Sequence, residues 1–75
     1  MLDKLKEIIV NYVEAEPEQI TPDSRFVEDL GFTSFDFMSM LGEIEEELDV
    51  EVDQREAAGL RTVGEAAAYL SKLSD

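Results

Sequence analysis

The sequence contains neither cysteine nor histidine. Without cysteine the chain can form no disulfide bond and no thiolate metal site, and this absence suits a cytoplasmic protein. Histidine is the commonest general base and cysteine the best nucleophile in enzymes, and the chain lacks both of these catalytic groups. Because 75 residues are also too few for a deep pocket, we expect a protein that is not an enzyme.

Long apolar runs and basic residues are also scarce. No apolar run approaches the ~18 residues of a membrane-spanning helix, so we predict no insertion into a membrane. Six Lys and Arg stand against 19 Asp and Glu, which gives a formal net charge of −13. Since affinity for nucleic acids and anionic membranes depends on basic side chains, we expect the chain to bind neither.

The acidic residues are concentrated in the middle of the chain. Ten of them lie between Phe26 and Gln54, and all six basic residues lie outside that stretch. A surface that serves only solubility would mix the two signs. The distribution therefore predicts partner proteins with basic surfaces, which electrostatic steering would bring to the acidic segment.

The first half of the chain contains one helical pattern and one long connector. Apolar residues recur at helical spacing over about residues 2–15, which predicts an amphipathic helix. Pro17, Pro22 and Gly31 interrupt the pattern over residues 16–33. Because so long a loop in a compact domain usually has a function, we interpret this segment as an ordered connector with a helical turn inside it.

The second half contains three further helical segments. Thr33 and Asp36 form a capping-box pattern, which predicts a second helix that runs to about Leu48. An extended connector over residues 49–53 leads to a short helical segment over residues 54–60. A last helix begins at a second capping-box pattern, Thr62-x-x-Glu65.

These elements predict an all-α fold. Three main amphipathic helices and one short helix would form a small four-helix bundle, with the long loop between the first and the second helix. The length allows one core, so we expect residues 1–75 to be a single domain and a monomer. Connector side chains that could hold the loop to the core are Ile20, Phe26, Val27, Leu30 and Phe32.

The second helix has two distinct faces when its residues are placed 100° apart. One narrow sector is apolar and is the predicted core face; its members are Phe37, Met40, Leu41, Ile44 and Leu48. Phe35 and Met38 fall on the opposite side among acidic residues. An apolar centre with a charged rim is typical of a protein interface. The alternative is that Phe35 and Met38 pack beneath the long connector.

The segment Asp29-Leu30-Gly31-Phe32-Thr33-Ser34-Phe35-Asp36 resembles the modification site of acyl carrier proteins. In that family an Asp-Leu-Gly segment leads into Asp-Ser-Leu, and the serine bears a phosphopantetheine group. The first helix, long loop, acidic second helix and final helix also match in order and spacing, so the resemblance covers essentially the whole chain.

The resemblance implies a carrier that holds acyl intermediates as thioesters on a 4′-phosphopantetheine arm attached to Ser34. The pathways that it implies are fatty acid, polyketide or specialised lipid synthesis. A phosphopantetheinyl transferase that uses coenzyme A and magnesium would attach the arm. The acyl chain could shelter among core residues such as Phe37, Leu41, Ile44 and Ala66.

By the same resemblance, acyl-processing enzymes would dock on the second helix through basic surfaces. The residues we assign to this partner-binding surface are Phe35, Asp36, Met38, Glu43, Glu45, Glu46 and Glu47. No residue is assigned a catalytic role or a role as a metal ligand.

The chain departs from the family motif on both sides of Ser34. Thr33 stands where Asp is usual, and Phe35 stands where Leu is usual. Both changes lie at the recognition site, so they predict either a specialised carrier with its own transferase or partners, or reduced modification by a general transferase. Thr33 and Ser39 are rival hydroxyl groups, but Ser39 lies a full turn inside the helix and is expected to be less accessible.

Three other interpretations use the same residues. The acids Asp49, Glu51 and Asp53 suggest a calcium loop, but Gln54 and Leu60 stand where such a loop needs Gly and Glu. An acidic helical adaptor without a prosthetic group would bind proteins through Phe35 and Met38 alone. An aminoacyl or peptidyl carrier would share the fold, although the strongly acidic surface favours acyl cargo.

Overall fold

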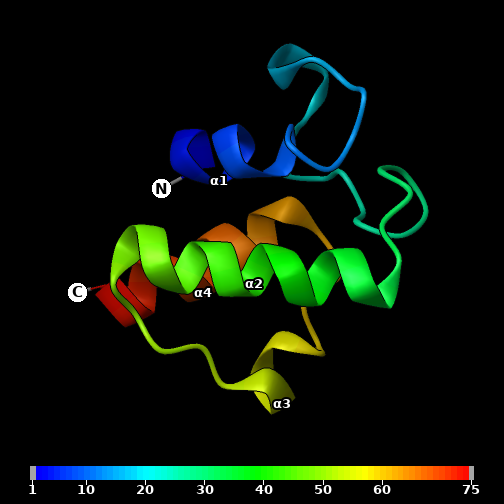
Figure 1. Cartoon of the computed structure of the whole chain (residues 1–75). Coiled ribbons are helices and arrows are strands. Elements are labelled where there is room, and N and C mark those ends of the chain that lie inside the picture. Colours follow the sequence, from blue (N-terminus) through cyan, green and yellow to red (C-terminus); the bar gives the residue numbers. More distant parts are fainter. Residues whose placement is uncertain (1, 75) are drawn as a thin grey trace.

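The computed structural model describes residues 2–74, and every named element among them is helical. The elements in chain order are α1 (Leu2–Ile9), the 3-10 turn η1 (Pro17–Gln19), α2 (Ser34–Leu48), α3 (Gln54–Ala57) and α4 (Val63–Ser74). Helix α1 packs on both α2 and α4, and the short α3 lies on the other side of α2 (Figure 1). The predicted all-α bundle with three main helices and one short helix is confirmed.

The core lies where the three main helices meet. Helix α2 contributes Met40, Leu41 and Ile44, which are buried, while Phe37 and Leu48 are half-buried against them. The predicted core face of this helix is therefore confirmed. The buried residues of the other two main helices are Leu5, Ile8 and Ile9 of α1 and Val63, Ala66 and Leu70 of α4.

Helix α1 is shorter than the sequence predicts, because it ends at Ile9 instead of near residue 15. The amide groups of Asn11 and Tyr12 donate to carbonyls three residues earlier, at 3.1 and 2.9 Å, so the helix tightens into a turn. This turn brings the Tyr12 ring to a centroid distance of 5.9 Å from Phe32. A tertiary contact thus overrides the helical pattern that continues in the sequence.

The connector before α2 is ordered, as predicted, and contains the turn η1. Ile20, Phe26 and Phe32 are buried in the core, but Val27 is 65% exposed, so the prediction that Val27 holds the loop to the core was wrong. The backbone of the connector bonds to the start of α4: Val63 N donates to Ser24 O at 2.9 Å. These bonds satisfy backbone groups that would otherwise be buried without partners.

Helix α3 spans four residues, fewer than the predicted segment over 54–60. The Asp53 carboxylate accepts a hydrogen bond from Arg55 N at 2.8 Å and caps its start. After Ala57, the amide of Leu60 donates to a carbonyl three residues earlier at 3.0 Å, so the chain turns before it can extend the helix. The predicted connector over residues 49–53 is confirmed as a non-helical link between α2 and α3. Asp49, with a φ of 53°, ends α2, and Asp53 is extended.

The second capping box is confirmed at the start of α4. Glu65 N donates to Thr62 Oγ1 at 3.2 Å, and Thr62 N donates to Glu65 Oε1 at 3.0 Å. The same carboxylate oxygen accepts from Arg61 N at 2.9 Å. These backbone donors, Arg61 first, lower the pKa of Glu65. Over residues 2–74 no helix is long and apolar enough to cross a membrane.

Candidate functional site

Ser34 is the first residue of α2, and the residue before it fixes the helix end. The Thr33 hydroxyl accepts a hydrogen bond from Asp36 N at 3.1 Å, and Thr33 N donates to the Asp36 carboxylate at 3.2 Å. This reciprocal pair is the capping box that the sequence predicts. It holds the first turn in place, with Ser34 exposed on it.

The Ser34 side chain fits covalent attachment of a phosphodiester. Its hydroxyl makes no hydrogen bond to any of residues 2–74, and neither does the amide N–H of Ser34 or Phe35. Free amide groups and the positive end of the helix dipole favour a negatively charged group at this point. Ser39, the rival hydroxyl, is only half-exposed and lies inside the helix, in line with the prediction that it is less accessible.

The turn before Ser34 is held by Arg25, whose side chain forms ion pairs with Asp29 and Glu28. The Asp29 carboxylate accepts hydrogen bonds from the backbone N of Arg25 at 2.8 Å and from its Nε and Nη2 at 3.1 and 3.0 Å. The side-chain bond from Arg25, followed by the backbone bond, lowers the pKa of Asp29. Gly31 follows with a φ of +73°, a conformation that glycine adopts without strain. Asp29 therefore positions the chain that leads to Ser34.

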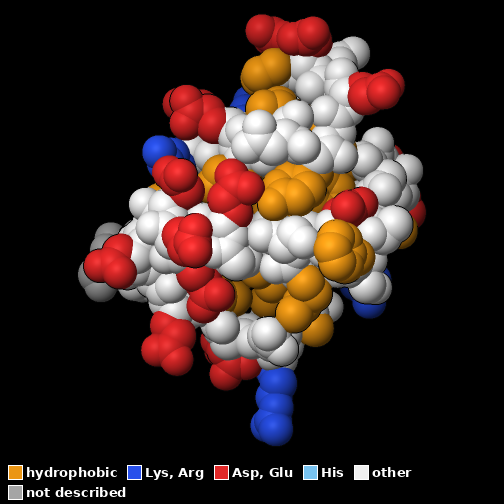
Figure 2. All heavy atoms as spheres, in the orientation of Figure 1, with side chains coloured by type: hydrophobic (Ala, Val, Ile, Leu, Met, Phe, Trp, Pro, Cys, Tyr) orange, Lys and Arg blue, Asp and Glu red, His pale blue; other side chains and the backbone are white. Residues whose placement is uncertain are grey.

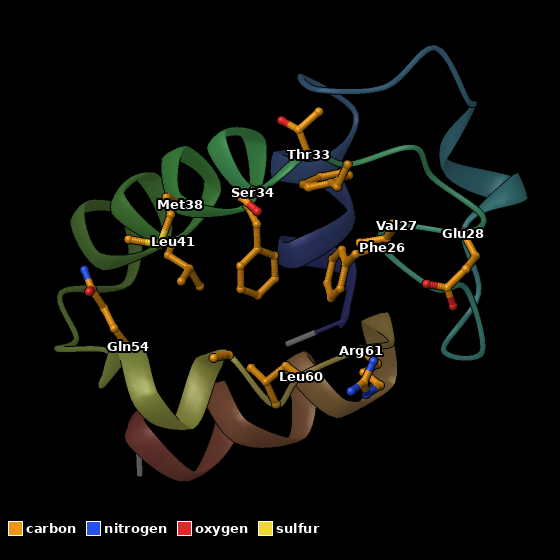
Figure 3. Close-up of a pocket in the computed structure, with 13 residues that line it drawn as sticks. Phe26, Val27, Glu28, Thr33, Ser34, Met38, Leu41, Gln54, Leu60 and Arg61 are labelled. Atoms are coloured by element: carbon orange, nitrogen blue, oxygen red, sulfur yellow. The ribbon is translucent and has the colours of Figure 1, made fainter.

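A cavity of about 320 Å³ begins beside Ser34. It is bordered by the connector before α2, by one face of α2 and by the segment from α3 to α4 (Figure 3). Figure 3 shows Phe26, Leu41 and Leu60 around one central space, with Ser34 at the start of α2 beside it. The cavity thus links the exposed hydroxyl to an apolar interior.

Two of the four residues predicted to shelter an acyl chain line this cavity. They are Phe37 and Leu41 of α2. Ile44 and Ala66 lie in the core instead. The sequence analysis missed Leu60 and Arg61 as lining residues, because nothing in their local pattern indicates that the α3–α4 segment folds back against α2.

The apolar residues of the predicted partner surface are exposed. Phe35 is 79% and Met38 is 46% exposed, so Phe35 does not pack beneath the connector. In Figure 2, apolar side chains reach the surface near the N-terminal end of α2, and acidic side chains gather toward its C-terminal end. Met38 also lines the cavity, so it is shared between the surface and the interior.

Some of the acidic residues predicted for this surface make bonds within the chain. Glu43 accepts a hydrogen bond from Tyr12 Oη at 3.0 Å, and Lys4 Nζ lies 3.5 Å from Glu47 Oε2. Both contacts join α2 to the α1 side of the bundle. Burial of the Tyr12 hydroxyl and its bond to Glu43 raise the pKa of Tyr12.

Glu45 also makes a bond within the chain, whereas Glu46 does not make one within the described residues. The Glu45 carboxylate accepts from Val52 N at 3.0 Å and so holds the extended connector after α2. Glu46 is exposed and has no bond within the described chain. Structural roles for Glu43, Glu45 and Glu47 were not anticipated, since their partners lie in other elements. Across residues 2–74 no group of three or more acidic residues is arranged to hold a metal ion.

The family model described as "Phosphopantetheine attachment site" matches residues 3–70. An acyl carrier protein of Clostridium perfringens is 39% identical over 72 residues, which cover 96% of this chain and 95% of that protein. An acyl carrier protein of a Sulfurovum species is 33% identical over 73 residues, with 97% of each chain covered. These relatives are named as acyl carrier proteins, and the family model is one of phosphopantetheine attachment, so the matches give no support to an adaptor without a prosthetic group.

The fold agrees with these matches. The solved structure of an acyl carrier protein from Enterococcus faecalis superposes with a TM-score of 0.84 at 32% identity, over 97% of this chain and 92% of that one. The cofactor of the protein is therefore covalently attached 4′-phosphopantetheine. Sequence, structure and site agree, and the chain belongs to the acyl carrier protein family.

Proposed function

We propose that Ser34 bears the 4′-phosphopantetheine arm and that the protein carries acyl intermediates on it as thioesters. The observation that supports this most directly is the exposed Ser34 hydroxyl, unbonded among the described residues, at the mouth of an apolar cavity. The arm supplies the thiol that a chain without cysteine lacks. The protein presents its cargo to other enzymes and is itself no catalyst.

The attachment would be made by a phosphopantetheinyl transferase. The Ser34 oxygen bonds to the phosphorus that carries the pantetheine of coenzyme A, the pyrophosphate bond of coenzyme A breaks, and 3′,5′-adenosine bisphosphate leaves while the Ser34 hydroxyl gives up its proton. No titratable side chain of the described residues bonds to this hydroxyl, so the base that takes the proton belongs to the transferase. Free amide groups of Ser34 and Phe35 stabilise the negative charge that remains.

The cavity would hold the acyl chain near the arm. Phe37 and Leu41 line it from α2, and Leu60 lines it from the opposite side. Burial of apolar carbon contributes about 0.8 kcal/mol per CH₂, so even a short acyl chain gains from entering. An apolar interior and a charge of −13 favour acyl over aminoacyl or peptidyl cargo. The route would be fatty acid, polyketide or specialised lipid synthesis.

Acyl-processing enzymes would dock on the exposed face of α2. Phe35 and Met38 offer apolar contact there, and Glu46 offers a carboxylate that is not engaged elsewhere in the described chain. We keep Asp36, Glu43, Glu45 and Glu47 in the proposed partner surface, since a carboxylate with one intramolecular bond can still accept another. We also propose that residues 1–75 act as one monomeric domain in the cytoplasm.

The test is intact mass before and after incubation with coenzyme A, magnesium and a broad-specificity phosphopantetheinyl transferase. The native chain should gain one phosphopantetheine, and Ser34→Ala should gain none. Ser39→Ala removes the other hydroxyl of the same helix and should gain as the native chain does. Equal labelling of Ser34→Ala and the native chain would contradict attachment at Ser34.

A further inference from the structure

One wall of the cavity is aromatic. The chain has four phenylalanines, and three of them, Phe26, Phe32 and Phe37, line the cavity. The fourth, Phe35, lies outside it and is 79% exposed. Three of the six aromatic residues of the chain are thus gathered at the cavity that opens beside Ser34.

The three rings are held in a fixed geometry. Phe26 lies 5.4 Å from Phe32 at 61° and 5.3 Å from Phe37 at 68°, as measured between ring centroids and ring planes. Both are edge-to-face arrangements, which aromatic rings prefer over a face-to-face stack. Phe26 and Phe32 are only 2% and 3% exposed, and the Tyr12 ring packs behind Phe32 at 5.9 Å. Close packing on several sides leaves these rings little freedom to rearrange.

The cavity has room for one more ring and a short spacer. An engineered protein cavity of about 150 Å³ is large enough to bind benzene, and this one has about 320 Å³. Met38 lines the cavity near Ser34, and a methionine sulfur makes favourable contacts at the edge of an aromatic ring. The other apolar lining residues are Val27, Leu41, Ala58 and Leu60.

We propose that this cavity selects acyl cargo that ends in an aromatic ring over saturated cargo with the same carbon skeleton. A phenyl group can extend the edge-to-face series of Phe26, Phe32 and Phe37, whereas a saturated ring gains only from burial. A planar group also loses less rotational freedom on entry than a flexible alkyl chain does. The inference rests on the proposed function, because the cargo is held on the arm at Ser34.

The experiment compares two matched cargoes on the complete chain. One sample carries a 3-phenylpropanoyl group on the arm and the other a 3-cyclohexylpropanoyl group, each joined by an amide that does not hydrolyse. Cargo that binds only the folded state raises the melting temperature Tm. The phenyl sample should melt higher than the cyclohexyl sample, by about 4 °C if one aromatic contact separates them. A cavity that recognised hydrophobicity alone would favour the more apolar cyclohexyl group.

Two variants make the comparison specific to the aromatic wall. Phe37→Leu removes one of the three lining rings and should reduce the difference in Tm between the two cargoes. Phe35→Leu makes the same chemical change at an exposed position outside the cavity and should leave the difference intact. If Phe37→Leu does not fold, nuclear Overhauser contacts between the cargo ring and the rings of Phe26 and Phe37 in the native chain provide the same test.

The outcomes separate this inference from the proposed function. Failure of the native chain to gain the arm at Ser34, both with a broad-specificity transferase and with a cognate one, overturns both. Attachment with an equal or higher Tm for the cyclohexyl sample overturns the cargo selectivity alone. A phenyl preference that is undiminished in Phe37→Leu, or cargo rings without contacts to Phe26 and Phe37, also overturns it.

Discussion

At the scale of single residues, two helical glycines have opposite surroundings. A Cβ atom at Gly64 would lie 2.9 Å from Pro22 O, whereas a Cβ at Gly42 would have no neighbour within 4 Å. We expect Gly64→Ala to force the connector away from α4 and to lower the free energy of unfolding by about 1–3 kcal/mol. Gly42→Ala should raise it by about 0.5–1 kcal/mol, because alanine is the better helix former. Urea unfolding followed by circular dichroism measures both, and a neutral Gly64→Ala would contradict the close approach to Pro22.

The turn held by Asp29 predicts a pH dependence at the same scale. Because the folded-state pKa of Asp29 is lowered, its contribution to stability is present above the ordinary pKa of about 3.9 and is lost as pH falls through the lowered value. Asp29→Asn should therefore reduce Tm at pH 7 and reduce it less as the pH approaches about 3. The control is Asp23→Asn, which removes the charge of an exposed aspartate in the same connector that has no bond among residues 2–74. A Tm loss for Asp29→Asn that is independent of pH would contradict the role of its charge.

At the scale of elements, a hydrogen bond joins the end of α1 to α2. Tyr12 Oη donates to Glu43 at 3.0 Å, while the Tyr12 ring packs on Phe32. Tyr12→Phe keeps the ring and loses the bond, so the free energy of unfolding should fall by about 0.5–1.5 kcal/mol. Since the pKa of Tyr12 is raised, this contribution is present below pH of about 10 and is lost as pH rises through the raised pKa.

A double-mutant cycle isolates this contact between the two elements. Tyr12→Phe combined with Glu43→Ala should cost less than the sum of the single changes, because either one alone breaks the bond. Glu46→Ala changes an exposed glutamate of the same helix that has no bond within the described chain. The effect of Glu46→Ala on the free energy of unfolding should add to that of Tyr12→Phe. If the effects of Tyr12→Phe and Glu43→Ala were also strictly additive, the bond between Tyr12 and Glu43 would contribute nothing to stability.

At the scale of the whole molecule, the charge of −13 opposes the compact state. Salt shortens the Debye length from about 30 Å at 0.01 M to about 8 Å at 0.15 M, which screens repulsion between exposed acids. We expect Tm to rise over this range, by roughly 4–8 °C for each kcal/mol of repulsion removed. Glu46→Gln should raise Tm in low salt and change it little in high salt. A fall of Tm with salt would mean that ion pairs such as Lys4–Glu47 outweigh the repulsion.

What the sequence determined by itself is the local structure around Ser34. The capping box of Thr33 and Asp36 and the core face of α2 depend on contacts between residues no more than a few positions apart. Such contacts can be predicted from spacing alone. The motif from Asp29 to Asp36, together with the acidic second helix and the order of the elements, was sufficient to indicate the family.

Only the tertiary structure decided where α1 ends, what surrounds the cavity and which carboxylates are engaged. The turn after Ile9 depends on Tyr12 meeting Phe32, and the cavity depends on Leu60 facing Leu41 across the fold. These partners lie far apart in the sequence, and their contacts form only when the helices pack. Periodicity shows that a side chain is buried, but packing determines which side chain it meets.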